Sequence, residues 1–116
     1  MPTDCTLICR RVHRDLVHAL EHARSRLAVA AAADTKLMTA ERWREYLETE
    51  AGLRRCIREL RLRQHTERHL PAAAASGLLH EIASTLRRET RRGDALELCR
   101  RLREILSSLA QIPGGP

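Results

Sequence analysis

Residues 39–70 read TAERWREYLETEAGLRRCIRELRLRQHTERHL, and this stretch decides the fold class. Thr39 is a suitable N-cap, because its hydroxyl can accept a hydrogen bond from a backbone N–H that the first helical turn leaves unpaired. The span contains no proline, and Gly52 is its only glycine. Pro71 lacks an N–H group and its ring clashes with the preceding turn, so we expect it to end the helix. The stretch therefore predicts one long helix over residues 39–70.

Apolar residues recur along this stretch at steps of three and four, the spacing of a seam that packs against another helix. The seam consists of Trp43, Tyr46, Leu53, Ile57 and Leu60, with Glu50 and Gln64 as polar exceptions. Trp43 and Tyr46 are the only aromatic residues of the 116-residue chain. Because aromatic side chains bury more area than aliphatic ones, we expect these two to mark a principal packing contact.

Three further stretches show helical spacing of their apolar residues, at residues 4–33, 72–92 and 94–111. The stripe of the first stretch consists of Cys5, Ile8, Cys9, Val12, Leu16, Leu20, Ala23 and Leu27. Asp94 with Glu97 has the spacing of a capping box at the start of the last helix. Each stretch therefore predicts an amphipathic helix.

These patterns predict an all-α fold, an antiparallel four-helix bundle in which two long helices are followed by a shorter helical hairpin. We expect residues 34–38 to form the first turn and residues 113–116 a loose tail. The β-branched, alternating runs that are typical of strands are absent. A chain of this length suits one compact domain over residues 1–116.

Net charge is +6, and 20 of the 21 basic residues are arginine. Such a balance favours an acidic partner or a nucleic acid, although a coding bias towards arginine would give the same composition. An Arg-rich nucleic-acid-binding regulator is therefore one hypothesis. The aromatic residues that stack on bases are missing, which favours a protein partner over a nucleic acid.

No apolar run approaches the roughly 18 residues that span a bilayer, and the N-terminus lacks the pattern of a signal peptide. We therefore expect a cytoplasmic protein that has no membrane partner. In that compartment the four cysteines are expected to stay free thiols rather than form two disulfides.

Two small groups of residues have spacings that occur in catalytic or metal sites. Cys5, Cys9 and His13 follow one another at four-residue steps, which can place metal ligands on one helix face. No fourth ligand is indicated, and both cysteines lie in the apolar stripe, so packing is the simpler interpretation. Arg63 and His69 have a spacing that resembles the motif of HEPN-type ribonucleases, which also arises by chance among so many arginines. We expect no enzyme, no cofactor and no metal site.

The predicted second helix also has apolar residues outside its seam, at Leu47, Ala51 and Leu62. Such residues either pack between two neighbouring helices, which is the simpler interpretation, or offer a groove to a partner. The groove hypothesis predicts a helical segment bound on the surface of the second and third helices, with the fourth helix able to cover it. The candidate partner-binding residues are Leu47, Leu62, Leu78 and Leu96 for the groove, and Arg100, Arg101 and Arg103 for acidic contacts.

Three segments carry a resemblance to a known family: TAERWREYLE at residues 39–48, LLHEI at 78–82 and CRRLREIL at 99–106. With this helix order the chain resembles the FliT-type flagellar export chaperones, which are small, cytoplasmic, all-helical bacterial proteins. The chain also resembles, nearly as well, the helical chaperones of the related injectisome. The resemblance implies binding of the filament-cap subunit before secretion, contact with the export ATPase apparatus, and regulation by a movable last helix. The expected function is a non-enzymatic chaperone or adaptor for an export substrate, and a homo-oligomer is compatible with it.

Overall fold

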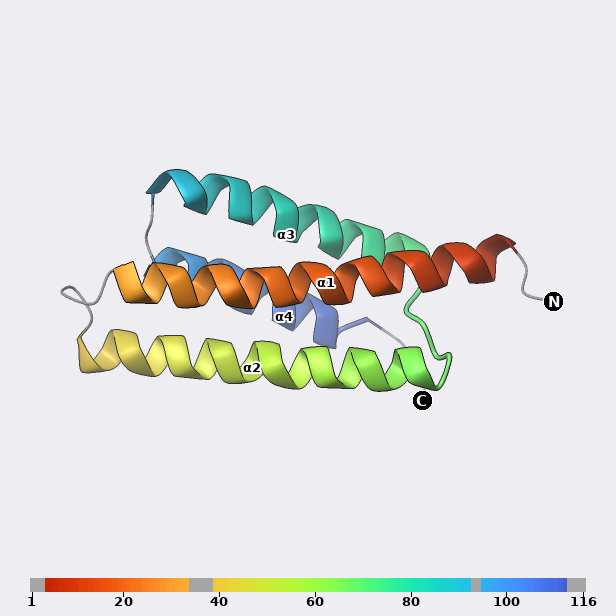
Figure 1. The fold of residues 1–116 in the computed structure, drawn as a ribbon, viewed down its shortest axis with the longest axis horizontal. Coiled ribbons are helices and arrows are strands. Elements are labelled where there is room, and N and C mark those ends of the chain that lie inside the picture. The colour runs from red at the N-terminus through yellow and green to blue at the C-terminus, as the bar shows by residue number, and fades with distance from the viewer. Residues whose placement is uncertain (1–3, 34–38, 93–94, 113–116) are drawn as a thin grey trace.

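The protein is an antiparallel four-helix bundle, as the sequence predicts (Figure 1). The computed structural model describes residues 4–33, 39–92 and 95–112. Its helices are α1 (Asp4–Ala33), α2 (Ala40–His65), α3 (Ala72–Arg92) and α4 (Ala95–Ala110). Successive helices run in opposite directions, two long ones followed by two shorter ones, within about 55 × 25 × 19 Å. No described helix has an apolar stretch long enough to cross a membrane.

The observed bounds agree with the predicted ones for α1 and α3, and within one residue for α4. Thr39 is the N-cap of α2, since its Oγ1 accepts a hydrogen bond from the Arg42 N–H at 3.2 Å. The expected turn at residues 34–38, the Asp94 cap and the tail at residues 113–116 lie outside the described residues.

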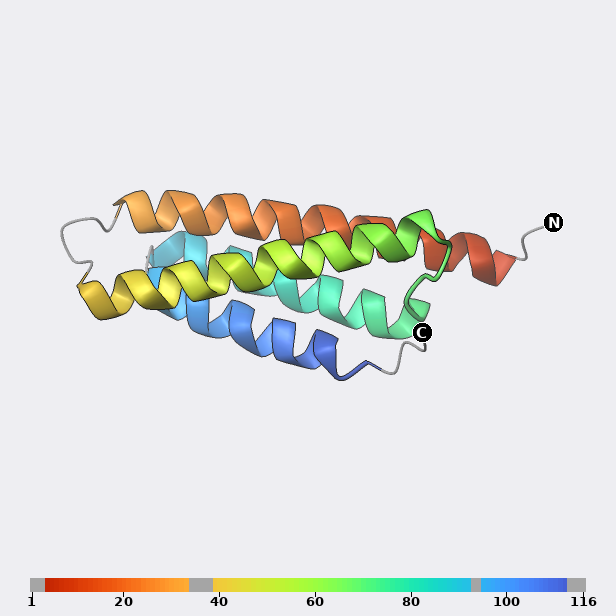
Figure 2. The ribbon, with the colours of Figure 1, turned by 90° about the horizontal axis from the view of Figure 1, so that it is seen from below.

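Helix α1 packs against α2 and α3, and α4 packs against the same two helices (Figures 1 and 2). Helices α2 and α3 therefore lie diagonally across the bundle. This arrangement corrects the expectation of a groove on a surface shared by the second and third helices, because those two helices are not neighbours.

The core is aliphatic and receives residues from all four helices. Its fully buried members include Leu16, Leu20, Leu27, Leu53, Ile82 and Leu102. The polar exception Glu50 has a side chain only 14% exposed, and it accepts hydrogen bonds from Arg24 and Arg54. The hydrogen bond from Arg54 lowers the pKa of Glu50 against the opposing effect of burial, with Arg24 adding to it. The seam of α2 thus admits a carboxylate because two guanidinium groups hold it.

The aromatic pair is not the principal packing contact that the sequence led us to expect. Trp43 is 38% exposed and meets Tyr46 edge to face, with ring centroids 5.8 Å apart. Tyr46 is half-buried and packs against the edge of the core. The buried part of the seam is instead Leu53, Ile57 and Leu60.

Helix α2 ends at His65, five residues before the predicted end. Glu67 has a φ of 58°, a left-handed conformation that a helix cannot continue through. Thr66 Oγ1 donates to the Leu62 carbonyl, so the last turn is capped by a side chain. Pro71 belongs to the start of α3, where its carbonyl accepts the Ala75 N–H at 3.0 Å. The proline therefore begins the next helix rather than ending this one.

The first turns of α1 extend beyond the ends of α2 and α3 (Figure 2). Leu7 and Ile8 are each about half exposed there, and Cys5 is exposed. The apolar stripe of α1 was expected to be buried from Cys5 to Leu27, but burial begins only where neighbouring helices reach it.

Leu53 and Leu47 of α2 offer a matched test of this packing, because Leu53 is fully buried and Leu47 is 58% exposed. We expect Leu53→Ala to lower the free energy of unfolding by about 2–5 kcal/mol through lost burial and a residual cavity. Leu47→Ala should change it by less than about 0.5 kcal/mol. Urea unfolding followed by circular dichroism measures both. Equal losses would contradict the helix orientation described here.

Candidate functional site

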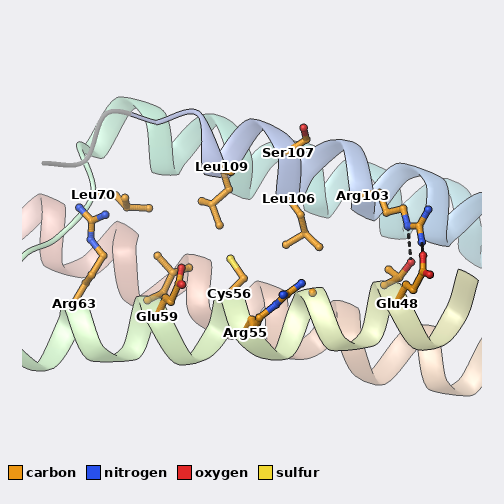
Figure 3. Close-up of a pocket in the computed structure, with 14 residues that line it drawn as sticks. Glu48, Arg55, Cys56, Glu59, Arg63, Leu70, Arg103, Leu106, Ser107 and Leu109 are labelled. Atoms are coloured by element: carbon orange, nitrogen blue, oxygen red, sulfur yellow. Dashed lines mark hydrogen bonds and ion pairs between the residues drawn. The ribbon is translucent and has the colours of Figure 1, made fainter. Parts of the chain in front are cut away.

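An open groove of about 550 Å³ lies between helices α2 and α4 (Figure 3). We call it the α2/α4 groove. Its apolar lining consists of Gly52, Cys56, Leu60, Leu70, Leu106, Leu109 and Ala110. Its polar lining consists of Glu48, Thr49, Arg55, Glu59, Arg63, Arg103 and Ser107. Figure 3 shows Cys56, Leu106 and Leu109 pointing into the space between the two helices. An apolar floor with a charged rim is the usual composition of a ligand site.

The groove exists because α4 approaches α2 closely at one level and then diverges from it (Figure 2). Gly52 allows the close approach, since a Cβ at this position would lie 3.2 Å from Leu106 Cδ1. Towards the C-terminal end of α4 the two helices separate, and Leu106 and Leu109 are only partly buried. These leucines pack against the edge of the core and line the groove as well.

Arg103 joins α4 to α2 at one end of the groove (Figure 3). Its guanidinium contacts Glu45 Oε2 at 2.7 Å and Glu48 Oε2 at 2.6 Å, and its Nε donates to Thr49 Oγ1 at 3.2 Å. Thr49 is buried, so this hydrogen bond fixes the Arg103 side chain against the α2 backbone. Arg103 was predicted to make acidic contacts with a partner, but its acidic contacts lie within the bundle.

The rest of the rim, from the middle of the groove to the end away from Arg103, carries positive charge (Figure 3). Arg55 is exposed and forms no hydrogen bond or ion pair among the described residues. Arg63 donates through Nε to the Arg68 carbonyl at 2.9 Å, which leaves its charge without a carboxylate partner in the described part of the chain. Glu59 is the acidic residue of this part of the rim. The rim is therefore suited to a ligand that brings carboxylates.

Cys56 contributes to the floor of the groove as an apolar group. Burial raises the pKa of the Cys56 thiol to about 12, and the charge of Glu59 adds to the effect. At neutral pH the thiol is therefore protonated, which makes it a weak nucleophile. The groove has no reactive sulfur at this position.

A second cavity of about 800 Å³ lies beside the groove, between the start of α2 and α4. Three of the predicted partner-binding residues line it, namely Leu96, Arg100 and Arg103. Arg100 and the neighbouring Arg101 both form ion pairs with Glu97, at 3.1 and 3.2 Å. Arg103 and Ser107 line both cavities, and the ion pairs of Arg103 with Glu45 and Glu48 lie between the two.

The other predicted partner-binding residues lie elsewhere. Leu47 and Leu62 are 58% and 57% exposed on α2, and neither lines the α2/α4 groove. Leu78 is 6% exposed and belongs to the core. The sequence showed that Leu78 lies on an apolar face of α3, but this face is the one that packs against the rest of the bundle.

His13 has a structural role that sequence reasoning missed. Its side chain is fully buried, and its Nε2 lies 2.8 Å from the Leu60 carbonyl. The Leu70 N–H donates to His13 Nδ1 at 3.1 Å, so the proton of the neutral ring is on Nε2 and donates to Leu60. His13 therefore joins α1 to the end of α2 and to the segment before α3. No sequence signal marks it, because both partners are backbone groups distant in the chain.

The positions of His13 and His69 bear on the two alternatives that were based on spacing, a metal site and a ribonuclease motif. Both His13 nitrogens are engaged by backbone groups, so the Cys5, Cys9 and His13 series has no free imidazole nitrogen for a metal. Across residues 4–33, 39–92 and 95–112, no three His, Cys, Asp or Glu side chains are grouped as metal ligands. Arg63 lines the α2/α4 groove, whereas His69 lines a different cavity beside the start of α1.

His69 lies against His13, with ring centroids 5.2 Å apart, and both its ring nitrogens are buried without a hydrogen-bond partner among the residues that the structure describes. Burial lowers the pKa of His69, and electrostatic interactions with His13 and Arg10 lower it further against the opposing charge of Glu67. In the unfolded chain His69 regains its ordinary pKa of 6.5. As pH falls through that value, His69 is protonated in the unfolded chain but not yet in the folded protein. The free energy of unfolding therefore decreases.

We therefore expect the urea midpoint to decrease as pH falls from 7.5 to 5.5, and His69→Leu to make this decrease smaller. Denaturant unfolding at several pH values measures both slopes. His22→Leu is the matched control, because His22 is exposed and should leave the slope unchanged. An identical pH slope in wild type and His69→Leu would show that His69 does not contribute.

No protein-family model matches the chain, and no curated protein or solved structure matches it either. The site is therefore interpreted from its own residues. These give an apolar groove with a positively charged rim, next to a thiol that is protonated at neutral pH.

Proposed function

We propose that this protein is a non-enzymatic adaptor or chaperone that binds a helical segment of a partner protein in the α2/α4 groove. The observation that supports the proposal best is the open space between α2 and α4, into which Cys56, Leu106 and Leu109 point (Figure 3). An amphipathic helix laid into such a groove buries its apolar face and leaves its polar face in solvent.

The dimensions of the groove suit a short helix. Its lining on α2 runs from Glu48 to Arg63, which corresponds to about 22 Å at 1.5 Å per residue. A partner helix of about 15 residues covers this length, with apolar residues at steps of three and four. Acidic residues beside that apolar stripe would face Arg55 and Arg63 on the rim.

The predicted partner-binding residues divide into two groups in this proposal. Leu96, Arg100 and Arg103 line the second cavity, beyond the ion pairs that Arg103 makes with α2, so they lie outside the part of the groove that the partner helix would occupy. Leu47 and Leu62 lie on the outer face of α2, about 22 Å apart along the helix axis. Exposed leucines at that separation are common on protein surfaces, so they are a secondary candidate surface.

The more specific role that we propose is a cytoplasmic chaperone of a flagellar or related export system. Its support is the resemblance of residues 39–48, 78–82 and 99–106 to that family, together with a bundle in which the last helix is also the shortest. The partner would then be an export substrate or a component of the export apparatus. Both the general and the more specific proposal place a helix of the partner in the α2/α4 groove.

The competing hypothesis is a nucleic-acid-binding regulator. Several arginines that suggested it are engaged by carboxylates within the bundle: Arg54 by Glu50, Arg61 by Glu21, Arg100 and Arg101 by Glu97, and Arg103 by Glu45 and Glu48. Guanidinium groups that already neutralise carboxylates release fewer counterions on meeting phosphates. These ion pairs favour the protein-binding proposal.

The direct test is photo-crosslinking inside cells of the native host. A photoreactive amino acid replaces Ser107, which is exposed on the groove rim, or Ser76, which is exposed on α3 and serves as the control. We expect illumination to attach a protein at position 107 and not at position 76. The attached peptide, mapped by mass spectrometry, should come from an amphipathic helical segment.

Substitutions of the groove leucines should then reduce the yield of this adduct. We expect Leu106→Asp with Leu109→Asp to reduce the adduct at position 107 about tenfold or more, because apolar contacts at the centre of an interface dominate binding. Leu47→Asp with Leu62→Asp should leave it within about twofold, since scattered surface residues contribute little to an interface elsewhere. Circular dichroism checks that each variant stays helical.

Two outcomes would contradict the proposal. The same proteins could be attached at positions 76 and 107, which would indicate non-specific proximity. The adduct at position 107 could instead be a nucleic acid, which would favour the competing hypothesis.

A further inference from the structure

A cleft of about 660 Å³ lies beside the N-terminal turns of α1, away from the α2/α4 groove, and we call it the α1-end cleft. Its lining consists of Leu7, Ile8, Arg10, Arg11 and Arg14 from α1, Gln64 from α2, and Glu67 and His69 from the segment that follows α2. None of these residues lines the α2/α4 groove. The cleft is therefore a separate candidate site.

The apolar part of the α1-end cleft is exposed because α1 extends past its neighbours (Figure 2). Leu7 is 49% exposed and Ile8 is 52% exposed, and they are adjacent in sequence and line the same cleft. Two large aliphatic side chains side by side on one helix end form a small apolar patch, unlike the widely separated Leu47 and Leu62.

The charged part of the cleft has an excess of positive charge. Arg10 pairs with Glu67 at 2.9 Å, and this is the ion pair that spans the cleft. Arg11 and Arg14 are exposed and form no hydrogen bond or ion pair with any described residue. They lie on successive turns of the same α1 face, together with Leu7. The cleft thus presents two unpartnered guanidinium groups next to an apolar patch.

We propose that the α1-end cleft binds an acidic amphipathic helix of a protein partner. Its carboxylates would accept hydrogen bonds from the guanidinium groups of Arg11 and Arg14, a pairing of matching planar geometry. Its apolar residues would cover Leu7 and Ile8. Gln64, at the opposite wall, supplies a neutral donor and acceptor for the polar edge of the same helix.

The chemistry of the cleft favours this occupant over two others. A second copy of the chain placed symmetrically on this surface would bring the same arginines together, and like charges at an interface are unfavourable. A single-stranded nucleic acid would use the guanidinium groups, but the cleft has no Trp, Tyr or Phe on which bases could stack. Only an acidic ligand with an apolar face uses both halves of the cleft.

This inference stands independently of the proposed function, since the two sites have no residue in common. The test uses fluorescence anisotropy with a labelled synthetic peptide of helical propensity, with leucines on one face and glutamates beside them. The full-length protein is titrated as wild type, as Arg11→Glu with Arg14→Glu, and as Arg87→Glu with Arg88→Glu. The last pair carries the same charge change at exposed positions on α3.

We expect the Arg11 and Arg14 substitutions to weaken binding at least about tenfold, because each guanidinium makes a charge-assisted hydrogen bond. The Arg87 and Arg88 substitutions should change it less than about threefold, since they act only through long-range charge. Leu7→Ser with Ile8→Ser should also weaken binding, and the same peptide with lysine in place of glutamate should not bind.

Four results would overturn the inference. Equal weakening by the two arginine pairs would show non-specific attraction, and a single-stranded RNA that binds through Arg11 and Arg14 more tightly than the peptide would indicate the other class of partner. Dimerisation in sedimentation that Arg11→Glu with Arg14→Glu abolishes would indicate a second copy. Loss of peptide binding in Leu106→Asp with Leu109→Asp, but not in the arginine variant, would place the peptide in the α2/α4 groove, leaving the proposed function intact.

Discussion

Helix α4 (Ala95–Ala110) makes its closest contacts with α2 through its middle turns, at Arg103 and Leu106, and the main surface features of the molecule follow from this constraint. Arg103 makes three contacts with α2, and Gly52 admits Leu106 close to the α2 backbone. Helix α4 has 16 residues and α2 has 26, so α4 spans only about two thirds of its neighbour's length. Beyond the close approach the helices diverge, and the apolar side chains between them are left partly exposed. A groove between packed helices is the expected result of such a mismatch.

The far end of α2 is held by a different interaction, the buried imidazole of His13. It binds a carbonyl at the end of α2 and an N–H before α3, so three segments converge on one side chain. Leu70 is positioned by this hydrogen bond and lines the groove, while His69 next to it lines the α1-end cleft. The short connection between α2 and α3 therefore separates two sites, and the geometry of both depends on His13.

The sequence was sufficient for the fold class, because four amphipathic stretches with short connections have few other arrangements. The sequence was insufficient where a contact with a residue distant in the chain decides where a helix ends or which side chain is buried. Pro71 suggested a helix as far as Leu70, whereas the chain leaves the helix at Glu67 and His13 captures the Leu70 N–H. Periodicity likewise marked Ile8 as a stripe residue, but Ile8 is 52% exposed, because the first turns of α1 extend beyond the ends of α2 and α3 (Figure 2).

The sequence also predicted only part of the candidate site, because contacts between residues distant in the chain decide which side chains line it. Apolar spacing identifies which face of a helix is apolar, but not which neighbour covers that face or for how many turns. Leu78 was therefore expected to line a groove and is in the core, while Leu106 and Leu109, which line the α2/α4 groove, were not among the predicted partner-binding residues. Arg103 was singled out for acidic contacts, and it makes them with α2.

The central claim is that a partner helix occupies the space between α2 and α4. Methyl NMR of the complex between the isotope-labelled protein and the partner segment tests it most directly, through nuclear Overhauser effects between the two molecules. The account predicts such effects at the methyl groups of Leu106 and Leu109, and none at Leu47 and Leu62. Effects at Leu47 and Leu62, with Leu106 and Leu109 unperturbed, would contradict it.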